Sequence, residues 1–279
     1  MKELLDKPYP LRQFLIVERD EIIEAKRKAE REAIEKLSDE DSAQKNSITK
    51  IISSTLANSF STSLSGTLGG MLVEVIMKSV EKQKELSRKI NVNYLSYTET
   101  QTLKFPIGHP RENELYVGHP TLSGVYYPIN EFHKKVFEHK FAELNFLLMN
   151  LGAKKVEVEY ISGWDFEAMS QVDVPSKGRG KLGEKTLNSK RTIYKANYED
   201  NDSLKLPDEL AWYHFEPTWQ SVGEGRLNHN LHNFNLLLEY NNDFGINADL
   251  YATVSNIGFG TKNKFNKKES TTWKVVGEF

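Results

Sequence analysis

The chain has 279 residues, of which 38% are apolar and 11% aromatic, enough to build a core and to exclude wholesale disorder. Its 37 basic and 39 acidic residues leave a net charge of −2, so the overall charge gives no reason to expect nucleic acid as a partner. The sequence contains no cysteine, which excludes disulfides, thiol nucleophiles and thiolate metal sites.

Residues 1–50 are charged and helix-forming, apart from a short apolar run at Phe14–Val17. Acidic residues follow that run closely, so it does not have the pattern of a cleaved signal peptide. We therefore expect a protein that is not secreted and that stays in the cytoplasm or at the inner face of the membrane. From about Asp20 to Leu37 strong helix formers of both charges, without Gly or Pro, predict an exposed helix.

Residues 51–73, IISSTLANSFSTSLSGTLGGMLV, carry no charge but include six serines and three threonines. On a helix, the large apolar side chains recur every four residues and form one stripe: Ile52, Leu56, Phe60, Leu64, Leu68 and Leu72. Small residues that would let two helices approach closely form neighbouring rows: Ala57, Ser61, Ser65, Gly66, Gly69 and Gly70. A helix of this length spans about 34 Å, enough to cross a hydrocarbon core of about 30 Å.

The composition of this segment leaves its environment open. Only nine of the 23 residues are strongly apolar, so a single copy would insert poorly into a bilayer and a membrane helix would need to be part of an oligomer. The alternative is a helix in water whose small face packs on another helix or on a second copy. The regular apolar spacing argues against a flexible Ser/Gly linker.

The pattern after Asn91 differs from that of residues 1–90. The charged residues up to about Lys89 continue the helical pattern, so we interpret 1–90 as a helical arm with one unusually long helix. Alternating β-branched and aromatic residues then predict strands, and the apolar period between Asn130 and Gly152 predicts an amphipathic helix. The later predicted elements are a hairpin of strands at 156–160 and 164–174, strands at 191–198, 234–240 and 271–279, and a short helix from Pro217, with 246–257 ambiguous. The fold class is therefore α+β, with residues 91–279 as a single domain built on a mostly antiparallel sheet.

A loop rich in Gly and Lys at Pro175–Arg191 is the first candidate site. Its basic residues could bind a nucleotide, another polyanion or an anionic lipid, because glycine lets backbone N–H groups surround an anion: Lys177, Arg179, Lys181, Lys185 and Arg191. The order of residues is not that of a phosphate-binding P-loop. The alternative is an ordinary solvated hairpin loop.

The second candidate site is the aromatic stretch Leu210–Leu227. Five of its residues could form a pocket with aromatic walls and a charged pair: Trp212, His214, Glu216, Trp219 and Arg226. The same residues could instead anchor the core by satisfying one another's polar groups. The seven histidines have no trusted ligand spacing and no GxSxG motif is present, so we expect no metal, no cofactor and no serine hydrolase site.

The leading hypothesis for function is a non-enzymatic membrane effector. Several copies of the 51–73 helix would form or gate a pore, controlled by an α+β domain that senses a ligand or a partner. In architecture this layout resembles the ligand-gated membrane effectors of bacterial immunity, although no motif is shared. The expected partners are further copies of the chain, a membrane and a phosphate-bearing small ligand.

The alternative is a soluble cytoplasmic oligomer that binds a ligand or a protein and whose N-terminal helices form the oligomer interface. An enzyme acting on a phosphate-bearing substrate is less favoured, because the sequence shows no set of general base and nucleophile.

Overall fold

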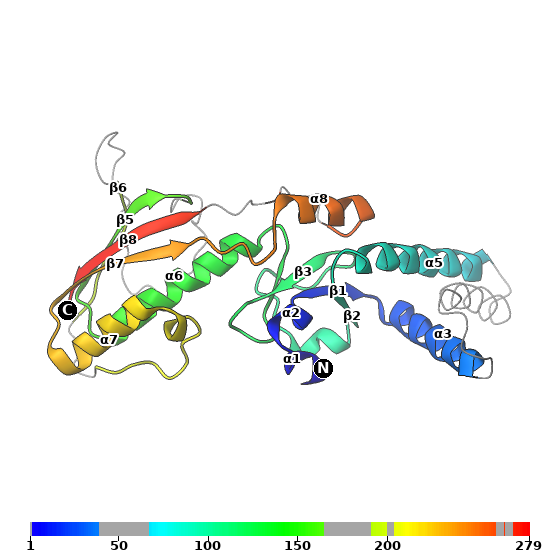
Figure 1. Ribbon diagram of the computed structural model, residues 1–279, viewed down its shortest axis with the longest axis horizontal. Helices are drawn as coiled ribbons and strands as arrows, with labels where there is room; N and C mark the ends of the chain where they lie inside the picture. The colour runs from blue at the N-terminus through cyan, green and yellow to red at the C-terminus, as the bar shows by residue number, and fades with distance from the viewer. Residues whose placement is uncertain (1, 39–66, 165–190, 200–203, 261–264, 266–269) are drawn as a thin grey trace. The chain divides into compact units, whose positions relative to one another are not determined.

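The computed structural model describes residues 2–38, 67–164, 191–199, 204–260, 265 and 270–279. The chain divides into two compact units, and we describe each by itself. Unit 1 comprises Met1–Ile129 and Ala248–Lys264, and unit 2 comprises Asn130–Asn247 and Phe265–Phe279. Each unit contains a four-stranded sheet with helices packed beside it, which confirms the α+β class (Figure 1).

The sheet of unit 1 is mixed and has the strand order β2-β1-β3-β4. Strand β1 pairs with β2 in parallel and with β3 in antiparallel orientation, and β3 pairs with β4 in antiparallel orientation. The bounds are Phe14–Glu18 for β1, Val92–Ser96 for β2, Leu115–Gly118 for β3 and Tyr126–Pro128 for β4. All five residues of β1 are buried, as expected for a central strand whose two faces are both covered. Because one sheet is mixed, the prediction of a mostly antiparallel sheet is not confirmed.

Two long helices lie between β1 and β2 in the sequence. They are α3, Asp20–Ser38, which begins two residues after β1 ends, and α5, Thr67–Ser87. Ile22 and Ala25 of α3 pack with Ile76 of α5 in a small apolar cluster. The crossover through these helices allows β2 to return parallel to β1. The shorter elements of unit 1 are α1 (Lys2–Leu5), α2 (Tyr9–Arg12), the 3₁₀ helix η1 (Glu99–Thr102) and α8 (Ala248–Ile257).

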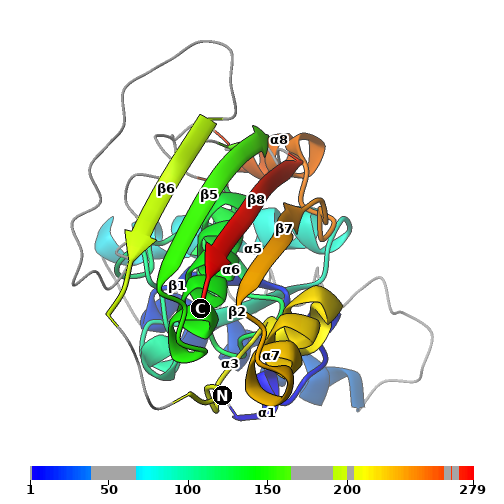
Figure 2. The ribbon, with the colours of Figure 1, turned by 90° about the vertical axis from the view of Figure 1, so that its left-hand side faces the viewer.

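The sheet of unit 2 is antiparallel throughout and has the order β6-β5-β8-β7. Its strands are β5 (Lys155–Ser162), β6 (Arg191–Asn197), β7 (Asn233–Tyr240) and β8 (Thr271–Glu278). Figure 2 shows the sheet from one face, with helix α6, Phe132–Asn150, behind it. The remaining elements are the 3₁₀ helix η2 (Tyr213–Phe215) and α7 (Pro217–His229).

An aromatic core holds α6 against this sheet. Phe137 and Phe141 of α6 meet the ring of Trp273 on β8 edge to face, with ring centroids 4.8 and 5.2 Å apart. The helix ends as predicted, because Gly152 just beyond it adopts a φ of 76°, which an L side chain disfavours. The predicted amphipathic helix is therefore confirmed, as are the strands that become β5 to β8.

The hypothesis of a pore-forming membrane effector is wrong. In the part of the chain that the structure describes, no helix is long and apolar enough to cross a membrane. Helix α5 starts inside the uncharged segment, but it runs on to Ser87 through charged residues from Glu74 onward, and Ile76 is buried against α3. The charged half of α5 is thus part of the packed unit 1, which contradicts the prediction of a transmembrane helix that forms a pore or channel.

The two residue sets predicted on the 51–73 helix lie partly outside the described residues. Leu68, Gly69, Gly70 and Leu72 fall in the first two turns of α5. The others lie outside: Ile52, Leu56, Ala57, Phe60, Ser61, Leu64, Ser65 and Gly66. The single long N-terminal helix is not confirmed, because residues 39–66 lie outside the described part of the chain and only α3 and α5 are described on either side of them. The division of the chain at residue 90 and the oligomer interface on the N-terminal helices stay predictions.

Candidate functional site

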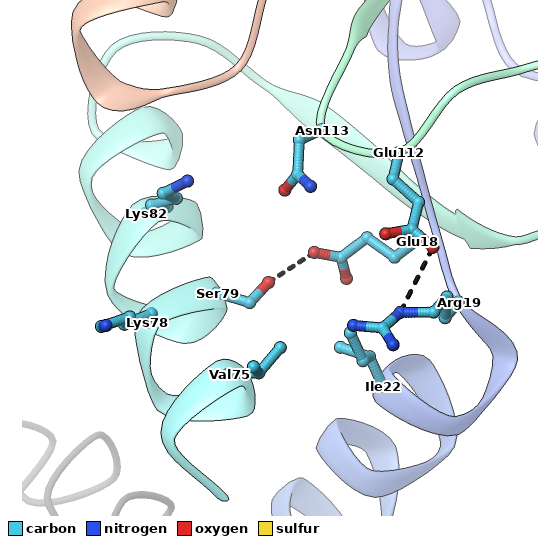
Figure 3. Close-up of a pocket in the computed structure, with 9 residues that line it drawn as sticks. All are labelled: Glu18, Arg19, Ile22, Val75, Lys78, Ser79, Lys82, Glu112 and Asn113. Atoms are coloured by element: carbon cyan, nitrogen blue, oxygen red, sulfur yellow. Dashed lines mark hydrogen bonds and ion pairs between the residues drawn. The ribbon is translucent and has the colours of Figure 1, made fainter. Parts of the chain in front are cut away.

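A cavity of about 190 Å³ lies in unit 1 at the carboxyl end of β1, between the start of α3 and the middle of α5 (Figure 3). Ligands of sheets with parallel strands bind at this end of the strands, where the connections to helices diverge. The cavity is lined by Glu18, Arg19, Ile22, Val75, Lys78, Ser79, Lys82, Glu112 and Asn113.

The local sequence explains why polar groups meet at this point. The apolar run of β1 ends at Glu18, and Arg19 is the single residue between the strand and α3. The N–H groups of Ile22 and Ile23 both donate to the Arg19 carbonyl at 3.1 Å, so the first turn of α3 starts at the cavity. The N-terminus of a helix is the positive end of its dipole.

Helix α5 contributes one face to the cavity wall. Val75, Lys78, Ser79 and Lys82 occupy positions i, i+3, i+4 and i+7, so they lie on the same side of the helix. Figure 3 shows the hydroxyl of Ser79 directed at Glu18 and the amino end of Lys82 directed toward the side of Asn113. The opposite wall comes from the loop at Glu112 and Asn113, where Asn113 adopts a φ of 56°.

Glu18 forms the floor of the cavity and accepts hydrogen bonds from both long helices. Its carboxylate accepts from Ser79 Oγ at 2.5 Å, from Lys26 Nζ at 2.7 Å and from Gln83 Nε2 at 2.9 Å. Lys26 also donates to Ser79 Oγ at 2.7 Å. This buried network, which we name the Glu18 cluster, consists of Glu18, Lys26, Ser79 and Gln83. It joins α3 and α5 to the end of β1.

The Glu18 cluster is nearly dry, which sets its electrostatics. The side chains of Glu18 and Lys26 are only 4% and 11% exposed. Burial lowers the pKa of Lys26, while the charge and hydrogen bond of Glu18 oppose that shift. Lys26 and Glu18 therefore form a buried ion pair in which each charge compensates the other. Glu18 does not need a ligand to neutralise its charge.

The rim of the cavity carries the remaining charges. Arg19 Nε forms an ion pair with Glu112 at 3.2 Å. Lys82 Nζ lies 5.7 Å from the ring centroid of Phe259, which follows α8. Among the lining residues, three cations (Arg19, Lys78 and Lys82) stand against two carboxylates (Glu18 and Glu112), so the lining has a formal charge of +1. Lys26, behind the lining, compensates Glu18.

The hydroxyl of Ser79 in the Glu18 cluster could be taken for a nucleophile. It donates its proton to Glu18 and accepts a hydrogen bond from Lys26. Both functions of the hydroxyl are thus used inside the protein, and we interpret Ser79 as a connector between α5 and the strand end.

The aromatic site predicted in Leu210–Leu227 is only partly assembled, and it is in unit 2. Trp212, Glu216 and Trp219 converge on Lys140 of α6: Glu216 binds Lys140 Nζ at 2.5 Å, and Nζ lies 5.6 and 6.0 Å from the ring centroids of Trp212 and Trp219. The protein's own lysine supplies the cation that two aromatic walls attract. Since Trp219 is fully buried and Trp212 nearly so, this arrangement favours the core-anchor interpretation.

The other two predicted residues lie apart from this group. His214 is exposed in η2. Arg226 of α7 donates to the carbonyls of Leu151 and Leu231, both at 3.1 Å, and stacks over Phe279. Arg226 therefore fixes α7 to the ends of α6 and β8.

Glu143 of α6 holds the start of the aromatic stretch in place, which the sequence did not predict. Its carboxylate accepts the backbone N–H groups of Ala211, Trp212 and Tyr213 at 2.7, 2.6 and 3.0 Å. The indole N–H of Trp212 donates to His139 Nδ1 at 2.9 Å, and burial lowers the pKa of His139.

The basic loop lies almost entirely outside the described residues. This applies to Lys177, Arg179, Lys181 and Lys185, whereas Arg191 is the first residue of β6. A search of the described ranges found no group of three His, Asp or Glu side chains that could hold a metal ion. The cavity was not predicted from the sequence, although the charged residues Glu18, Arg19 and Asp20 directly after an apolar run were a signal for it.

Comparison of the chain with protein-family models, curated proteins and solved structures found no match. The fold and the cavity define an α+β protein with a small polar site at a strand end. Any more specific function has to be inferred from that site.

Proposed function

We propose that the chain is a binding module that takes a small anion, or the phosphate group of a small ligand, in the cavity of unit 1. The observation that carries the proposal is the net positive lining of the cavity at the carboxyl end of β1, in which both carboxylates already have cationic partners. The proposal keeps ligand binding from the alternative hypothesis of a ligand- or protein-binding oligomer. It assigns the ligand to the cavity of unit 1 instead of the basic loop at Pro175–Arg191.

The internal pairing of the two carboxylates supports an anionic ligand. Glu18 is satisfied by three donors and Glu112 by Arg19, so neither requires a cation from solution. Lys82 and the guanidinium of Arg19 reach the rim, and the positive end of α3 starts beside them. Together these groups can bind phosphate oxygens by charge and by hydrogen bonds.

The size of the cavity supports a small ligand group. At about 190 Å³ it is below the roughly 300–1,000 Å³ of pockets that enclose drug-sized molecules. A phosphate or a carboxylate fits such a volume, and a larger ligand would leave its remaining atoms outside the cavity.

The roles of the cluster residues support binding rather than catalysis. An acid, base or nucleophile must keep a reactive atom directed at the substrate. Lys26, Ser79 and Gln83 instead direct their polar atoms at Glu18. Their arrangement fixes the shape of the cavity, and the rim residues are left to meet the ligand.

Titration with inorganic phosphate, followed by calorimetry and thermal unfolding at constant ionic strength, tests the proposal. A Kd of about 1 mM corresponds to about −4 kcal/mol, and phosphate at ten times its Kd should stabilise the chain by about 1.4 kcal/mol. We expect Lys82→Met to weaken binding about tenfold, because it removes a rim cation. Lys84→Met is the matched control, since Lys84 is exposed on the same helix and does not line the cavity.

Two results would overturn the proposal. The first is the absence of a phosphate-dependent shift relative to chloride. The second is an equal loss of binding in the Lys82 and Lys84 variants, which would indicate non-specific attraction to a basic helix.

A further inference from the structure

Strand β7 is an outer strand of the unit 2 sheet, with β8 on one side and no partner strand on the other among the described residues. One hydrogen bond shows which residues of β7 direct their backbone groups toward β8. Phe279 N donates to His232 O at 2.8 Å, and these two residues lie opposite each other when the register of β7 and β8 is continued by one residue. Hydrogen-bonded pairs alternate along an antiparallel ladder. The N–H and C=O groups of Asn233, Asn235 and Leu237 therefore point away from β8.

The side chains of this edge do not protect it. Outer strands usually carry lysine, proline or inward charges that prevent pairing with another chain. The residues of β7 whose side chains are exposed are Asn233, Asn235, Leu237 and Glu239, with Leu237 45% exposed. The opposite outer strand, β6, carries Lys195 with its side chain 60% exposed. The β6 edge therefore has a lysine that opposes pairing, and β7 has none.

Helix α7 lies alongside the same edge. Its first residues are near the end of β7, since Lys140 binds both Glu216 at 2.5 Å and the carbonyl of Glu239 at 2.8 Å. Its last residue, His229, is four positions before Asn233, the start of β7. Figure 2 shows α7 beside and beyond the β7 edge, so an added strand would lie over this helix.

Exposed apolar side chains also occur on α7, which contacts β7, and on η2, which contacts α7. Besides Leu237 on β7, they are Leu227 on α7, 39% exposed, and Phe215 on η2, 69% exposed. Open backbone groups flanked by exposed apolar side chains are the features that an added strand requires.

We propose that a second copy of this chain pairs its β7 with this β7 in antiparallel orientation, joining the two four-stranded sheets into one of eight strands about a twofold axis. The row of exposed side chains has a single charge, Glu239. With the axis near Leu236 or Leu237, antiparallel pairing places Glu239 opposite Asn233 or Asn235 of the second copy, where an amide can donate to the carboxylate. Parallel pairing would place the two Glu239 side chains together, and like charges opposite each other destabilise a sheet.

The dimer is weak and reversible. One strand pair with its flanking apolar contacts is smaller than a standard interface of about 1,600 Å². The oligomeric state should therefore depend on the protein concentration.

Sedimentation of the full chain over a range of concentrations tests the proposal. Wild type should change from monomer to dimer, Leu237→Lys should shift the Kd at least tenfold toward monomer, and Thr192→Lys on β6 should leave it unchanged. Circular dichroism verifies that the variants fold. Wild type that remains monomeric at high micromolar concentration, or a dimer unaffected by Leu237→Lys, would overturn the proposal. So would assemblies larger than dimers that Thr192→Lys weakens, since these indicate β6 pairing with β7.

A cysteine provides a second test that does not depend on a charge. Because the chain has no cysteine, Leu237→Cys introduces the only thiol. Under mild oxidation it should form a covalent dimer much faster than Thr192→Cys at the opposite edge, since disulfides need Cα atoms within about 7 Å. Equal rates for the two variants would contradict the β7 pairing.

Discussion

Replacing Glu18 with Gln is the perturbation whose outcome the structure determines most directly. The carboxylate is 4% exposed and receives three donors, from Lys26, Ser79 and Gln83. In Glu18→Gln, one acceptor oxygen becomes an amide nitrogen that faces donors, and Lys26 loses its counter-charge while its side chain is only 11% exposed. Removing one member of a buried ion pair costs about 3–5 kcal/mol.

We expect a cost near the lower end of that range, about 3 kcal/mol, because Lys26 keeps its hydrogen bond to Ser79 and some contact with water. Lys26→Met leaves Glu18 charged and without its cation, and it should cost a similar amount. The double variant leaves no uncompensated buried charge. It should therefore be more stable than the sum of the single effects predicts, with a coupling free energy of about 2 kcal/mol.

Urea unfolding followed by two probes measures this cycle. All four tryptophans, Trp164, Trp212, Trp219 and Trp273, lie in unit 2, so tryptophan fluorescence reports on unit 2 alone. Circular dichroism follows both units. We expect Glu18→Gln to move the circular dichroism transition to lower urea and to change the fluorescence transition less. A loss below about 1 kcal/mol, or single effects that simply add, would refute the reasoning that the ion pair is buried and coupled.

Two further predictions concern other buried carboxyl groups. Glu114 is 3% exposed, and burial raises its pKa, so the folded chain binds its proton more tightly than the unfolded chain and stability falls as the pH rises above about 4.5. Glu114→Gln should remove this loss, so the variant should unfold at a higher temperature than wild type at pH 7 but not at pH 4. A difference in unfolding temperature that is the same at both pH values would show that the charge of Glu114 is not the cause. Glu143→Ala leaves three amides of residues 211–213 without their acceptor and should cost about 3 kcal/mol, measured by tryptophan fluorescence in urea. The exposed Glu209 changed to Ala is its control, and equal effects of the two would argue against the role of Glu143.

The sequence predicted unit 2 well because the evidence there is local. Strand β7 alternates strictly between exposed and buried side chains, and α6 repeats its apolar residues with a helical period. Either pattern can be recognised within about ten residues, without knowledge of the partner element. The bend after α6 at Gly152 is equally local, since it depends on the freedom of one glycine.

Strand β1 was not predicted, because it has no periodic pattern. Five buried residues in a row, FLIVE, are as compatible with a buried helix segment as with a strand. What makes them a strand is pairing with β2, whose residue Val92 lies opposite Phe14. Such a contact between residues far apart in the sequence is not visible in any local window, so the short run was included in a helical arm.

The cavity could not be predicted for the same reason. Ser79 and Gln83 lie 61 and 65 positions from Glu18 in the sequence, and each alone is an ordinary polar residue on a charged helix. Only the fold of α5 against α3 brings them to the end of β1. The predicted aromatic site drew on residues that are close in the sequence, but Lys140, on which Trp212, Glu216 and Trp219 converge, comes from α6. His214 and Arg226 lie apart from that group.

This distribution of contacts links binding in the cavity to the stability of unit 1. The Glu18 cluster holds α3 and α5 at the strand end, and the same two helices supply Ile22 and Lys82 to the cavity wall. An anion held between the rim groups therefore stabilises the packing of these helices, in addition to its own contacts. Since the tryptophans belong to unit 2, stabilisation by phosphate should appear mainly in the circular dichroism transition. A phosphate effect seen first in tryptophan fluorescence would place the anion in unit 2 instead.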